Sequence, residues 1–454
     1  MDLLSMVQMV NTYLSDYILC FLLIGLGLFY TLRTRFVQIR CIGEGFRRFF
    51  GNFSLHGETS QGGMSSFQAL ATAVAAQVGT GNVVGASGAI LTGGPGAIFW
   101  MWIIAFFGMA TNYAEAVLAQ ETRLVKEDGT ILGGPVYYIH RAFPGYFGKV
   151  LAVFFAVAIT LALGFMGCMV QSNSIGETSS AAFGIPAWSV GFIIALLAGF
   201  VFIGGTTRIA KITEKLVPIM AIFYLLGGLI ILLANYQRVP EAISLIFFYA
   251  FNPEAIIGGS WGIAIKTAIS QGVKRGLFSN EAGMGSTPHA HALANVKKPH
   301  DQGVVAMVGV FVDTFVVLTM TALVVITTLY TGDGILAHGA VEGVSKTNMA
   351  QLAFGSLFGA GIGSAFIAVS LLFFAFSTIL SWNLFAKINV EYLFGKAAVK
   401  VFSLIAIIFV FLGSCLSNDL VWELTDMFNN LMVIPNALAL FALSGIVVNN
   451  VNNK

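Results

Sequence analysis

The stretch AAQVGTGNVVGASGA, residues 75–89, places glycine and polar residues inside a long apolar run. Gly79, Thr80, Gly81 and Asn82 interrupt a segment that otherwise has the composition of a membrane helix. Glycine costs about 1 kcal/mol relative to alanine in a helix interior, and asparagine is also a poor helix former. Irregular backbone at membrane depth is tolerated only where it faces protein or a water-filled cavity. We therefore predict a broken helix whose free peptide groups face an internal site.

The composition of the whole chain agrees with a membrane location. Of its 454 residues, 57% are hydrophobic and 10% are charged, whereas soluble domains carry about 25% charged residues. This predicts an all-α protein that crosses the lipid bilayer many times. The net charge of +2 argues against a nucleic-acid partner, and the four cysteines lack metal-ligand spacing and are interpreted as packing residues. No nucleophile–base pair or phosphate motif lies at membrane depth, so we expect neither an enzyme nor a cofactor.

A membrane-spanning helix needs roughly 20 mostly apolar residues. Eleven segments meet this condition, at residues 15–32, 64–92, 95–120, 148–172, 186–203, 215–234, 257–281, 302–330, 362–387, 398–414 and 428–448. The sequence thus predicts eleven transmembrane helices.

The basic residues predict the orientation of these helices. Eighteen lysines and arginines follow the odd-numbered spans or end the chain, whereas the alternate connections hold only Arg238 and Lys346. Because basic residues concentrate on the cytoplasmic side, the N-terminus is expected outside and the C-terminus in the cytoplasm, in the cell (inner) membrane. The other three bases, Lys266, Lys274 and Arg275, lie in or beside the seventh span.

A second interrupted helix is expected five spans after the first. The stretch ISQGVKRGLFSNEAGMGS, residues 269–286, also mixes glycines with polar residues. Two interrupted helices in corresponding positions of two halves are typical of the central site of a transporter. A break exposes N–H groups, which favour an anion, and C=O groups, which favour a cation.

These two segments predict a five-plus-five inverted repeat with two broken helices and one extra N-terminal helix. Residues 63–234 would form the first repeat and residues 257–454 the second. Residues 1–62 would hold the extra span with a cytoplasmic loop, and residues 235–256 an extracellular connection.

Two motifs carry a resemblance to a known family. GTGNVVGASGAILTGGPGAIFWMW, residues 79–102, and GLFSNEAGMGSTPHAHA, residues 276–292, resemble the alanine or glycine:cation symporter family, and the resemblance covers nearly the whole chain. It implies the inverted-repeat fold of the amino acid–polyamine–organocation superfamily. It also implies sodium-driven uptake of alanine, and often glycine, by alternating access.

The resemblance implies a substrate site at the two breaks. Its expected residues are Gly79, Thr80, Gly81, Gln171, Gly276, Phe278 and Trp382. Thr80 and Gly81 would offer backbone N–H groups to the substrate carboxylate, and the second break at Gly276 and Phe278 would offer carbonyls to the ammonium. Gln171 would be a polar contact or a bridge between helices, and Trp382 would cap a small pocket or simply pack.

Two sodium positions are also implied. Asn82 would coordinate sodium beside the substrate. A second position would join the carbonyls of Ala75 and Val78 to the hydroxyls of Ser377 and Thr378. The alternative for the two hydroxyls is a hydrogen bond back to their own helix.

Intramembrane acids keep other functions open. Asp313 either pairs with Lys266 or takes a proton, and Glu281 is expected to pair with Lys274 or Arg275. Glu115 is expected to reach water near the end of its span. A proton-coupled amino-acid carrier is therefore the main alternative, and a channel is less favoured because rings of repeated loops are missing. The oligomeric state and the choice between alanine and glycine stay open.

Overall fold

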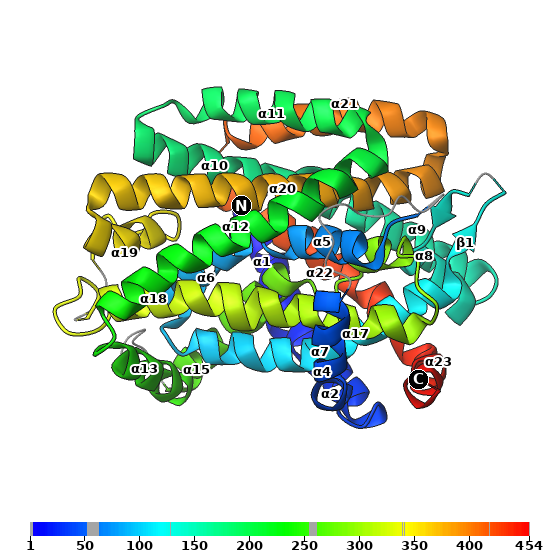
Figure 1. Ribbon diagram of the computed structural model, residues 1–454, viewed down its shortest axis with the longest axis horizontal. Helices are drawn as coiled ribbons and strands as arrows, with labels where there is room; N and C mark the ends of the chain where they lie inside the picture. The colour runs from blue at the N-terminus through cyan, green and yellow to red at the C-terminus, as the bar shows by residue number, and fades with distance from the viewer. Residues whose placement is uncertain are drawn as a thin grey trace.

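The computed structural model describes residues 3–51, 63–127, 129–253, 261–337, 339, 341–416 and 418–453. Most of its long helices run along the longest axis of the molecule (Figure 1). Helices α13 and α19 lie at the left end of that view, and β1, α8 and α23 lie at the right end. The predicted all-α class is confirmed, since the strands in the described part of the chain are only β1 (Leu124–Val125) and β2 (Ile131–Leu132).

The helices of the first half of the chain precede residue 252. They are α1 (Leu3–Tyr13), α2 (Cys20–Arg33), α3 (Val37–Arg40), α4 (Ile42–Gly51), α5 (Ser66–Gln77), α6 (Ala86–Gly93), α7 (Ala97–Thr122), α8 (Pro135–Ala142), α9 (Tyr146–Ile159), α10 (Cys168–Phe183), α11 (Ala187–Ile203), α12 (Gly205–Ala234) and α13 (Val239–Phe251).

The helices of the second half follow residue 260. They are α15 (Trp261–Asn280), α16 (Pro288–Ala292), α17 (Pro299–Val310), α18 (Thr319–Leu329), α19 (Met349–Phe358), α20 (Ala360–Phe394), α21 (Lys396–Gly413), α22 (Asn418–Ala442) and α23 (Ser444–Asn452). Short π-helical segments lie between consecutive α-helices, at η1 (Leu14–Leu19), η2 (Gly81–Gly85), η3 (Thr160–Gly167) and η4 (Phe311–Leu318). Such segments inside helices often mark functional sites.

Seven helical stretches of the described residues are long and apolar enough to cross a membrane, or nine if each of two bent pairs counts as one span. Helix α11, with 17 residues, and α15, which carries three bases, correspond to two further predicted spans. The predicted start of the seventh span, at residue 257, lies outside the described residues. The number of eleven spans therefore stays a prediction, whereas the many-helix membrane architecture is confirmed.

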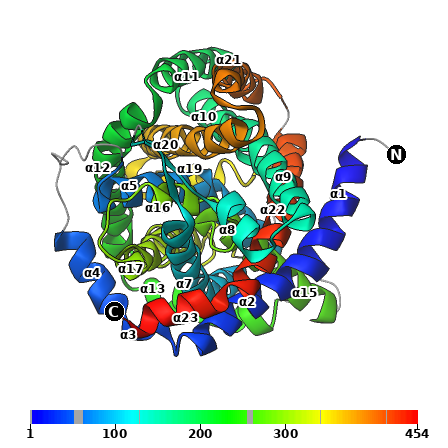
Figure 2. The same ribbon diagram turned by 90° about the vertical axis from the view of Figure 1, so that its right-hand side faces the viewer.

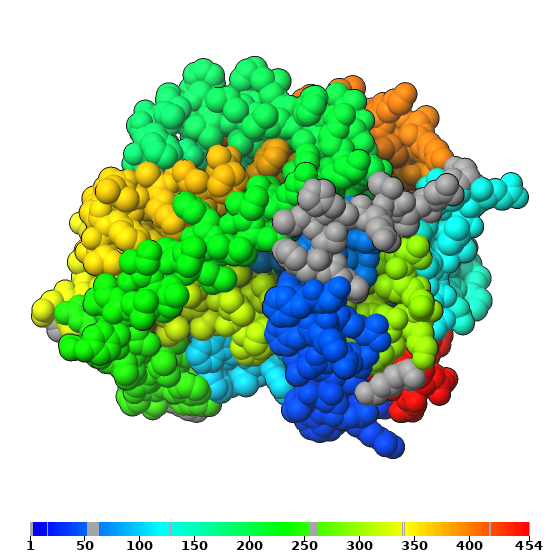
Figure 3. Space-filling view, viewed as in Figure 1, coloured from blue at the N-terminus to red at the C-terminus, as the bar shows by residue number. Residues whose placement is uncertain are grey.

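The outer surface of the bundle is apolar, as a lipid-facing surface must be. On α12, for example, Ile222, Leu226, Leu229 and Leu233 are all exposed. Figure 3 shows α12 crossing one face of the molecule diagonally, above α4. Viewed from the end of the bundle, α5 lies beside α12 on the left and α16 lies nearer the middle, while α11 and α21 lie at the top edge (Figure 2). The polar residues of the interior are therefore shielded by several apolar helices.

The eleventh predicted span, residues 428–448, has the wrong boundaries. Helix α22 begins ten residues earlier, at Asn418, and the chain bends by 58° after Ala442 into α23. The first turns of α22 contain three acids, Asp419, Glu423 and Asp426. In the structure Asp426 forms ion pairs of 3.0 Å with both Lys274 and Arg275 of α15, so the acid is neutralised inside the bundle.

Glycines allow α15 to approach α7 closely. A Cβ atom on Gly272 would lie 2.5 Å from the Cβ of Trp100, and one on Gly276 would lie 2.5 Å from Cγ2 of Ile104. Both distances are too short for two carbon atoms, so only glycine fits at this helix–helix contact. Small residues serve this purpose in many membrane-helix pairs.

We expect Gly272→Ala to destabilise the protein, because the new methyl group overlaps Trp100 on α7. Overpacking of this kind costs about 1–3 kcal/mol of unfolding free energy. Thermal unfolding of the purified protein in detergent measures the effect. Gly25→Ala on α2 is the matched control, because its Cβ would meet no atom within 4 Å. Equal unfolding temperatures for the two variants would contradict the predicted packing.

Candidate functional site

The predicted break in the second span is confirmed. Helix α5 ends at Gln77, and Val78 adopts φ −78° and ψ 89°, outside the helical region. Helical structure resumes by Gly81, and the two half-helices are bent by 44° relative to each other. The irregular residues are therefore Val78 and Gly79, slightly before the predicted centre, and Asn82 lies in the π-helical segment that follows.

Side chains bind the peptide groups that the break exposes. The N–H of Gly79 donates to Oδ1 of Asn82 at 3.0 Å, and the N–H of Thr80 donates to Oε1 of Gln171 at 3.0 Å. Gln171 comes from α10, so a neighbouring helix supplies an acceptor for the broken one. The structure thus brings the predicted residues Gly79, Thr80 and Gln171 together.

Two polar atoms beside this break have no hydrogen-bond partner among the described residues. They are Oγ1 of Thr80 and Nε2 of Gln171, and both side chains are fully buried. A buried polar group without a partner costs about 1–3 kcal/mol. Such atoms are rare in native proteins and call for an explanation. A small polar ligand bound at the break would supply the missing hydrogen bonds.

Four oxygen atoms converge between α5 and α20. Oγ1 of Thr378 lies 2.8 Å from the carbonyl oxygen of Ala75 and 3.5 Å from that of Val78. Oγ of Ser377 lies 3.5 Å from the same Ala75 oxygen. Gly79 is needed here, because a Cβ on it would lie 2.4 Å from Oγ1 of Thr378.

The two hydroxyls also bond back to their own helix, as the alternative interpretation expected. The carbonyl of Phe374 accepts from Ser377 at 2.8 Å and from Thr378 at 3.1 Å. Both sequence interpretations therefore describe part of the geometry. A group of neutral oxygens of this kind suits a hard monovalent or divalent cation.

The second break lies later in the chain than predicted. Helix α15 continues without interruption to Asn280, so placing Gly276 and Phe278 in the break was wrong. The chain turns over residues 281–287, where Glu281, Gly283 and Gly285 have φ of 57°, 87° and 82°. Gly276 contacts α7, and close helix packing explains this glycine better than a break.

Phe278 and Trp382 nevertheless lie beside the first break. Cδ1 of Phe278 would be 3.1 Å from a Cβ on Gly81, so this phenyl ring limits the space at the break. The rings of Phe278 and Trp382 contact edge to face, with centroids 5.9 Å apart. Trp382 also donates its indole N–H to the carboxylate of Glu281, at the start of the second turn.

Asp313 is the main residue that the predicted site omitted. Its carboxylate accepts hydrogen bonds from Nδ2 of Asn82 at 2.7 Å, Oγ of Ser279 at 2.9 Å and Oγ1 of Thr314 at 2.9 Å. These partners come from the first broken helix, the end of α15 and η4 itself. Of the two alternatives for Asp313, the pairing with Lys266 is wrong, because the Lys266 ammonium lies 3.2 Å from the hydroxyl of Tyr17 instead. The charge of Asp313 at membrane depth was the available sequence signal.

Glu115 was also misjudged, because it is fully buried and does not reach water. Its carboxylate accepts the backbone N–H groups of Gly283 and Gly285 at 3.0 and 2.9 Å. It accepts a third hydrogen bond from Nδ2 of Asn436 at 2.7 Å. Glu115 of α7 therefore holds the turn that forms the second break.

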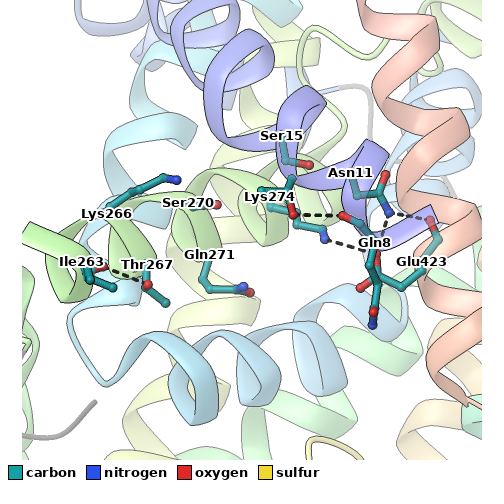
Figure 4. Close-up of a pocket in the computed structure, with 11 residues that line it drawn as sticks. Gln8, Asn11, Ser15, Ile263, Lys266, Thr267, Ser270, Gln271, Lys274 and Glu423 are labelled. Carbon is teal, nitrogen blue, oxygen red and sulfur yellow. Dashed lines mark hydrogen bonds and ion pairs between the residues drawn. The ribbon is translucent and has the colours of Figure 1, made fainter. Parts of the chain in front are cut away.

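The expected pairing of Glu281 with Lys274 or Arg275 is wrong as well. Glu281 accepts hydrogen bonds from Ser286 and Trp382, whereas both bases pair with Asp426. Lys274 lines a polar cavity of about 450 Å³ between α1, α15 and α22. Figure 4 shows Lys274, Asn11 and Glu423 turned toward one another at one end of this cavity. The ion pairs thus tie α15 to α22 beside the site.

Comparisons with known proteins agree with this architecture. The model of the sodium:alanine symporter family matches residues 1–453. The sodium/alanine symporter AgcS of Methanococcus maripaludis is 41% identical over 449 residues, which are 99% of this chain and 96% of AgcS. YrbD of Bacillus subtilis, named as a candidate sodium/proton-dependent alanine carrier, is 40% identical over 96% of this chain and 90% of its own length.

A solved structure shares the fold. The crystal structure of MhsT in complex with L-phenylalanine gives a TM-score of 0.58 at 13% identity, and the match covers 87% of this chain and 98% of MhsT. The predicted fold class, an inverted repeat with two broken helices, is confirmed by this similarity and by the two breaks. At this level of identity the likeness concerns the fold alone.

We expect Glu115→Gln to loosen the second turn. The glutamine amide group cannot replace both carboxylate oxygens as acceptors, so a backbone N–H of Gly283 or Gly285 loses its partner. The unfolding free energy should fall by about 1–3 kcal/mol, measured by thermal unfolding in detergent. Glu127→Gln, at an exposed position, is the control and should leave stability unchanged. A Glu115→Gln variant as stable as that control would refute the role of the carboxylate.

Proposed function

Because the chain belongs to the sodium:alanine symporter family, we propose that it imports alanine, and also glycine, together with sodium. The observation that carries the proposal is the group of oxygens from Ala75, Val78 and Thr378 at the first break. Membership of the family establishes a cation-coupled amino-acid symporter. AgcS, at 41% identity, is named for sodium and alanine, which supports this choice of ion and substrate.

The proposed substrate lies with its carboxylate against Thr80, Gly81 and Gln171. The unpartnered Nε2 of Gln171 and Oγ1 of Thr80 would then both hydrogen-bond to the substrate. Phe278 and Trp382 would limit its side chain, because their rings fill the space beside Gly81. One methyl group changes binding by only about 1–3 kcal/mol, so alanine and glycine should both bind.

The substrate ammonium is assigned to the end of α15. The N–H of Glu281 donates to the Leu277 carbonyl at 2.9 Å, whereas the N–H of Ala282 donates to the side chain of Asn280. The helical hydrogen bonds therefore end before the Phe278 carbonyl. The last carbonyls of a helix carry partial negative charge and favour a cation. We thus replace the predicted pair Gly276 and Phe278 by the Phe278 carbonyl for this role.

Two sodium positions are proposed. One uses the carbonyls of Ala75 and Val78 with the hydroxyls of Ser377 and Thr378. The other uses Asn82 beside the substrate, with the carboxylate of Asp313 as an added ligand. The hydrogen bond of 2.7 Å that Nδ2 of Asn82 donates to Asp313 brings the two side chains together. The sodium ligands would be their oxygen atoms, namely Oδ1 of Asn82 and the carboxylate of Asp313.

The proposed transport cycle follows from the inverted repeat, with residues 63–234 and 257–454 as its two halves. One bundle would rock against the other around the two breaks. The proposed location is the inner cell membrane, with the N-terminus outside and the C-terminus in the cytoplasm. The basic residues on α2, α3 and α4 support this orientation under the positive-inside rule.

A proton-coupled carrier is the second candidate. Asp313 and Glu281 are buried, and in the described part of the chain their hydrogen-bond partners are amides, hydroxyls and an indole, with no base among them. Carboxylates at membrane depth are typical of proton relays in transporters. YrbD, named for sodium and proton, supports keeping this alternative.

Sodium-driven uptake should depend on the hydroxyls of α20. In proteoliposomes, an inward sodium gradient should drive uptake of labelled alanine, and a potassium gradient should not. Ser377→Ala combined with Thr378→Ala should raise the sodium concentration for half-maximal uptake about tenfold or more, the equivalent of about 1.4 kcal/mol.

Ser370→Ala is the matched control for this pair. Ser370 lies on the same helix, and its hydroxyl bonds back to the Phe366 carbonyl at 2.8 Å, away from the break. This variant should keep the normal sodium dependence. No uptake of alanine or glycine under any gradient would refute the substrate assignment, and uptake unaffected in the double variant would refute the ion site.

Asp313→Asn distinguishes the two coupling ions. If sodium is the ion, loss of the carboxylate charge should weaken sodium binding, and a proton gradient alone should drive no uptake in either protein. Asp419→Asn, at an exposed acid, is the control. Proton-driven uptake without sodium in the original protein, abolished by Asp313→Asn, would overturn the sodium proposal in favour of proton coupling.

A further inference from the structure

Cys41, Glu44 and His300 form a cluster away from the two breaks. One ligand atom from each of the three side chains lies within 4.8 Å of the other two. Cys41 follows α3, Glu44 is in the first turn of α4, and His300 is in the first turn of α17. We propose that these three side chains form a binding site for a divalent transition metal ion such as Zn²⁺.

The geometry of the cluster suits a tetrahedral ion. Zinc binds nitrogen and carboxylate oxygen at about 2.0–2.2 Å and sulfur at about 2.3 Å, so neighbouring ligand atoms are roughly 3.3–3.6 Å apart. Nε2 of His300 lies 3.4 Å from Oε2 of Glu44. The sulfur of Cys41 lies within 4.8 Å of both atoms, so a shift of about 1.5 Å or less would complete three ligands, and a water molecule can be the fourth.

The surroundings orient two of the ligands. Nδ1 of His300 lies 2.7 Å from the hydroxyl of Tyr113 on α7, so this hydrogen bond directs Nε2 toward the cluster. Partners of this kind on the far nitrogen are usual for metal-binding histidines. Of the two carboxylate oxygens of Glu44, Arg48 binds Oε1, at 2.9 Å, and the other oxygen, Oε2, faces His300.

Burial favours a soft metal at this position. Cys41 is 0% exposed and His300 is 1% exposed, so little solvent competes for the ion. Thiolate together with imidazole selects zinc or a similar transition metal over magnesium or calcium. On binding, the thiol proton of Cys41 is released to solvent, because the thiolate is the ligand.

A metal ion here would fix α4 to α17. The two helices already touch closely, since a Cβ on Gly45 would lie 2.6 Å from the Val304 carbonyl oxygen. Helix α17 continues into η4, which carries Asp313. The ion would therefore restrain a helix that reaches the central site, and bound metal should stabilise the protein and slow transport.

Cobalt is the probe for the site, because a cobalt–thiolate bond absorbs in the near ultraviolet. The full chain, purified in detergent without a polyhistidine tag and treated with chelator, should show this band on addition of Co²⁺ and lose it on addition of Zn²⁺. Zn²⁺ alone should raise its unfolding temperature. Cys415→Ser, which removes an exposed thiol, is the control and should retain both effects.

Substitutions of the three proposed ligands and of Tyr113 test whether the metal binds at this cluster. Cys41→Ser and His300→Gln should abolish the cobalt band, and Tyr113→Phe should weaken metal affinity about tenfold. Glu44→Gln removes the carboxylate but keeps the size of a partly exposed side chain, so this variant can be tested even if a buried variant fails to fold. It should lose most of the zinc-induced stabilisation. No cobalt–thiolate band in the unaltered chain, or a band unchanged in His300→Gln and Glu44→Gln, would overturn the proposal.

Discussion

The structure depends on how it satisfies the backbone groups of a helix broken inside the membrane. An unpaired peptide group in an apolar medium costs several kcal/mol, so a break at Val78 and Gly79 requires partners from other helices. Gln171 of α10 accepts the N–H of Thr80, and Thr378 of α20 donates to the carbonyl of Ala75. The positions of α10 and α20 around α5 follow from this requirement.

The two breaks are supported in a related way. Glu115 lies on the helix that follows the first broken helix, and it holds the turn of the second break at Gly283 and Gly285. Asp313 lies on the helical stretch that follows the second broken helix, and it holds Asn82 beside the first break. The helical stretch that follows each break thus supplies one buried carboxylate to the other break. In the described part of the chain, both carboxylates are held by hydrogen-bond donors, with no lysine, arginine or histidine among their partners.

Much of this arrangement could be predicted from the sequence, because it is encoded locally. The break at Gly79 interrupts an apolar run, and Ser377 with Thr378 stand out on a long apolar helix. The errors concern residues whose environment depends on distant partners. The start of α22 lay outside the predicted eleventh span, and its Asp426 is buried through ion pairs with Lys274 and Arg275 of α15. The position of Glu115 near a helix end indicated water, whereas its true partners lie more than 160 residues away. Residue type alone could not distinguish the roles of Gly276 and Gly283. Gly276 allows α15 to pack closely against α7, whereas Gly283 adopts a positive φ in the second turn.

The short segment from Ala75 to Asn82 also explains how ion and substrate can be coupled. Its carbonyls at Ala75 and Val78 face the hydroxyls of α20, and its N–H groups at Gly79 and Thr80 face side-chain oxygens. On the proposed function, sodium binds the first set and the substrate carboxylate binds near the second. Each ligand then stabilises the same irregular backbone, so binding of one lowers the free energy needed to order the segment for the other. By linkage this effect is reciprocal, and it needs no direct contact between the two ligands. Symport would follow because both ligands stabilise the same short break at Val78 and Gly79.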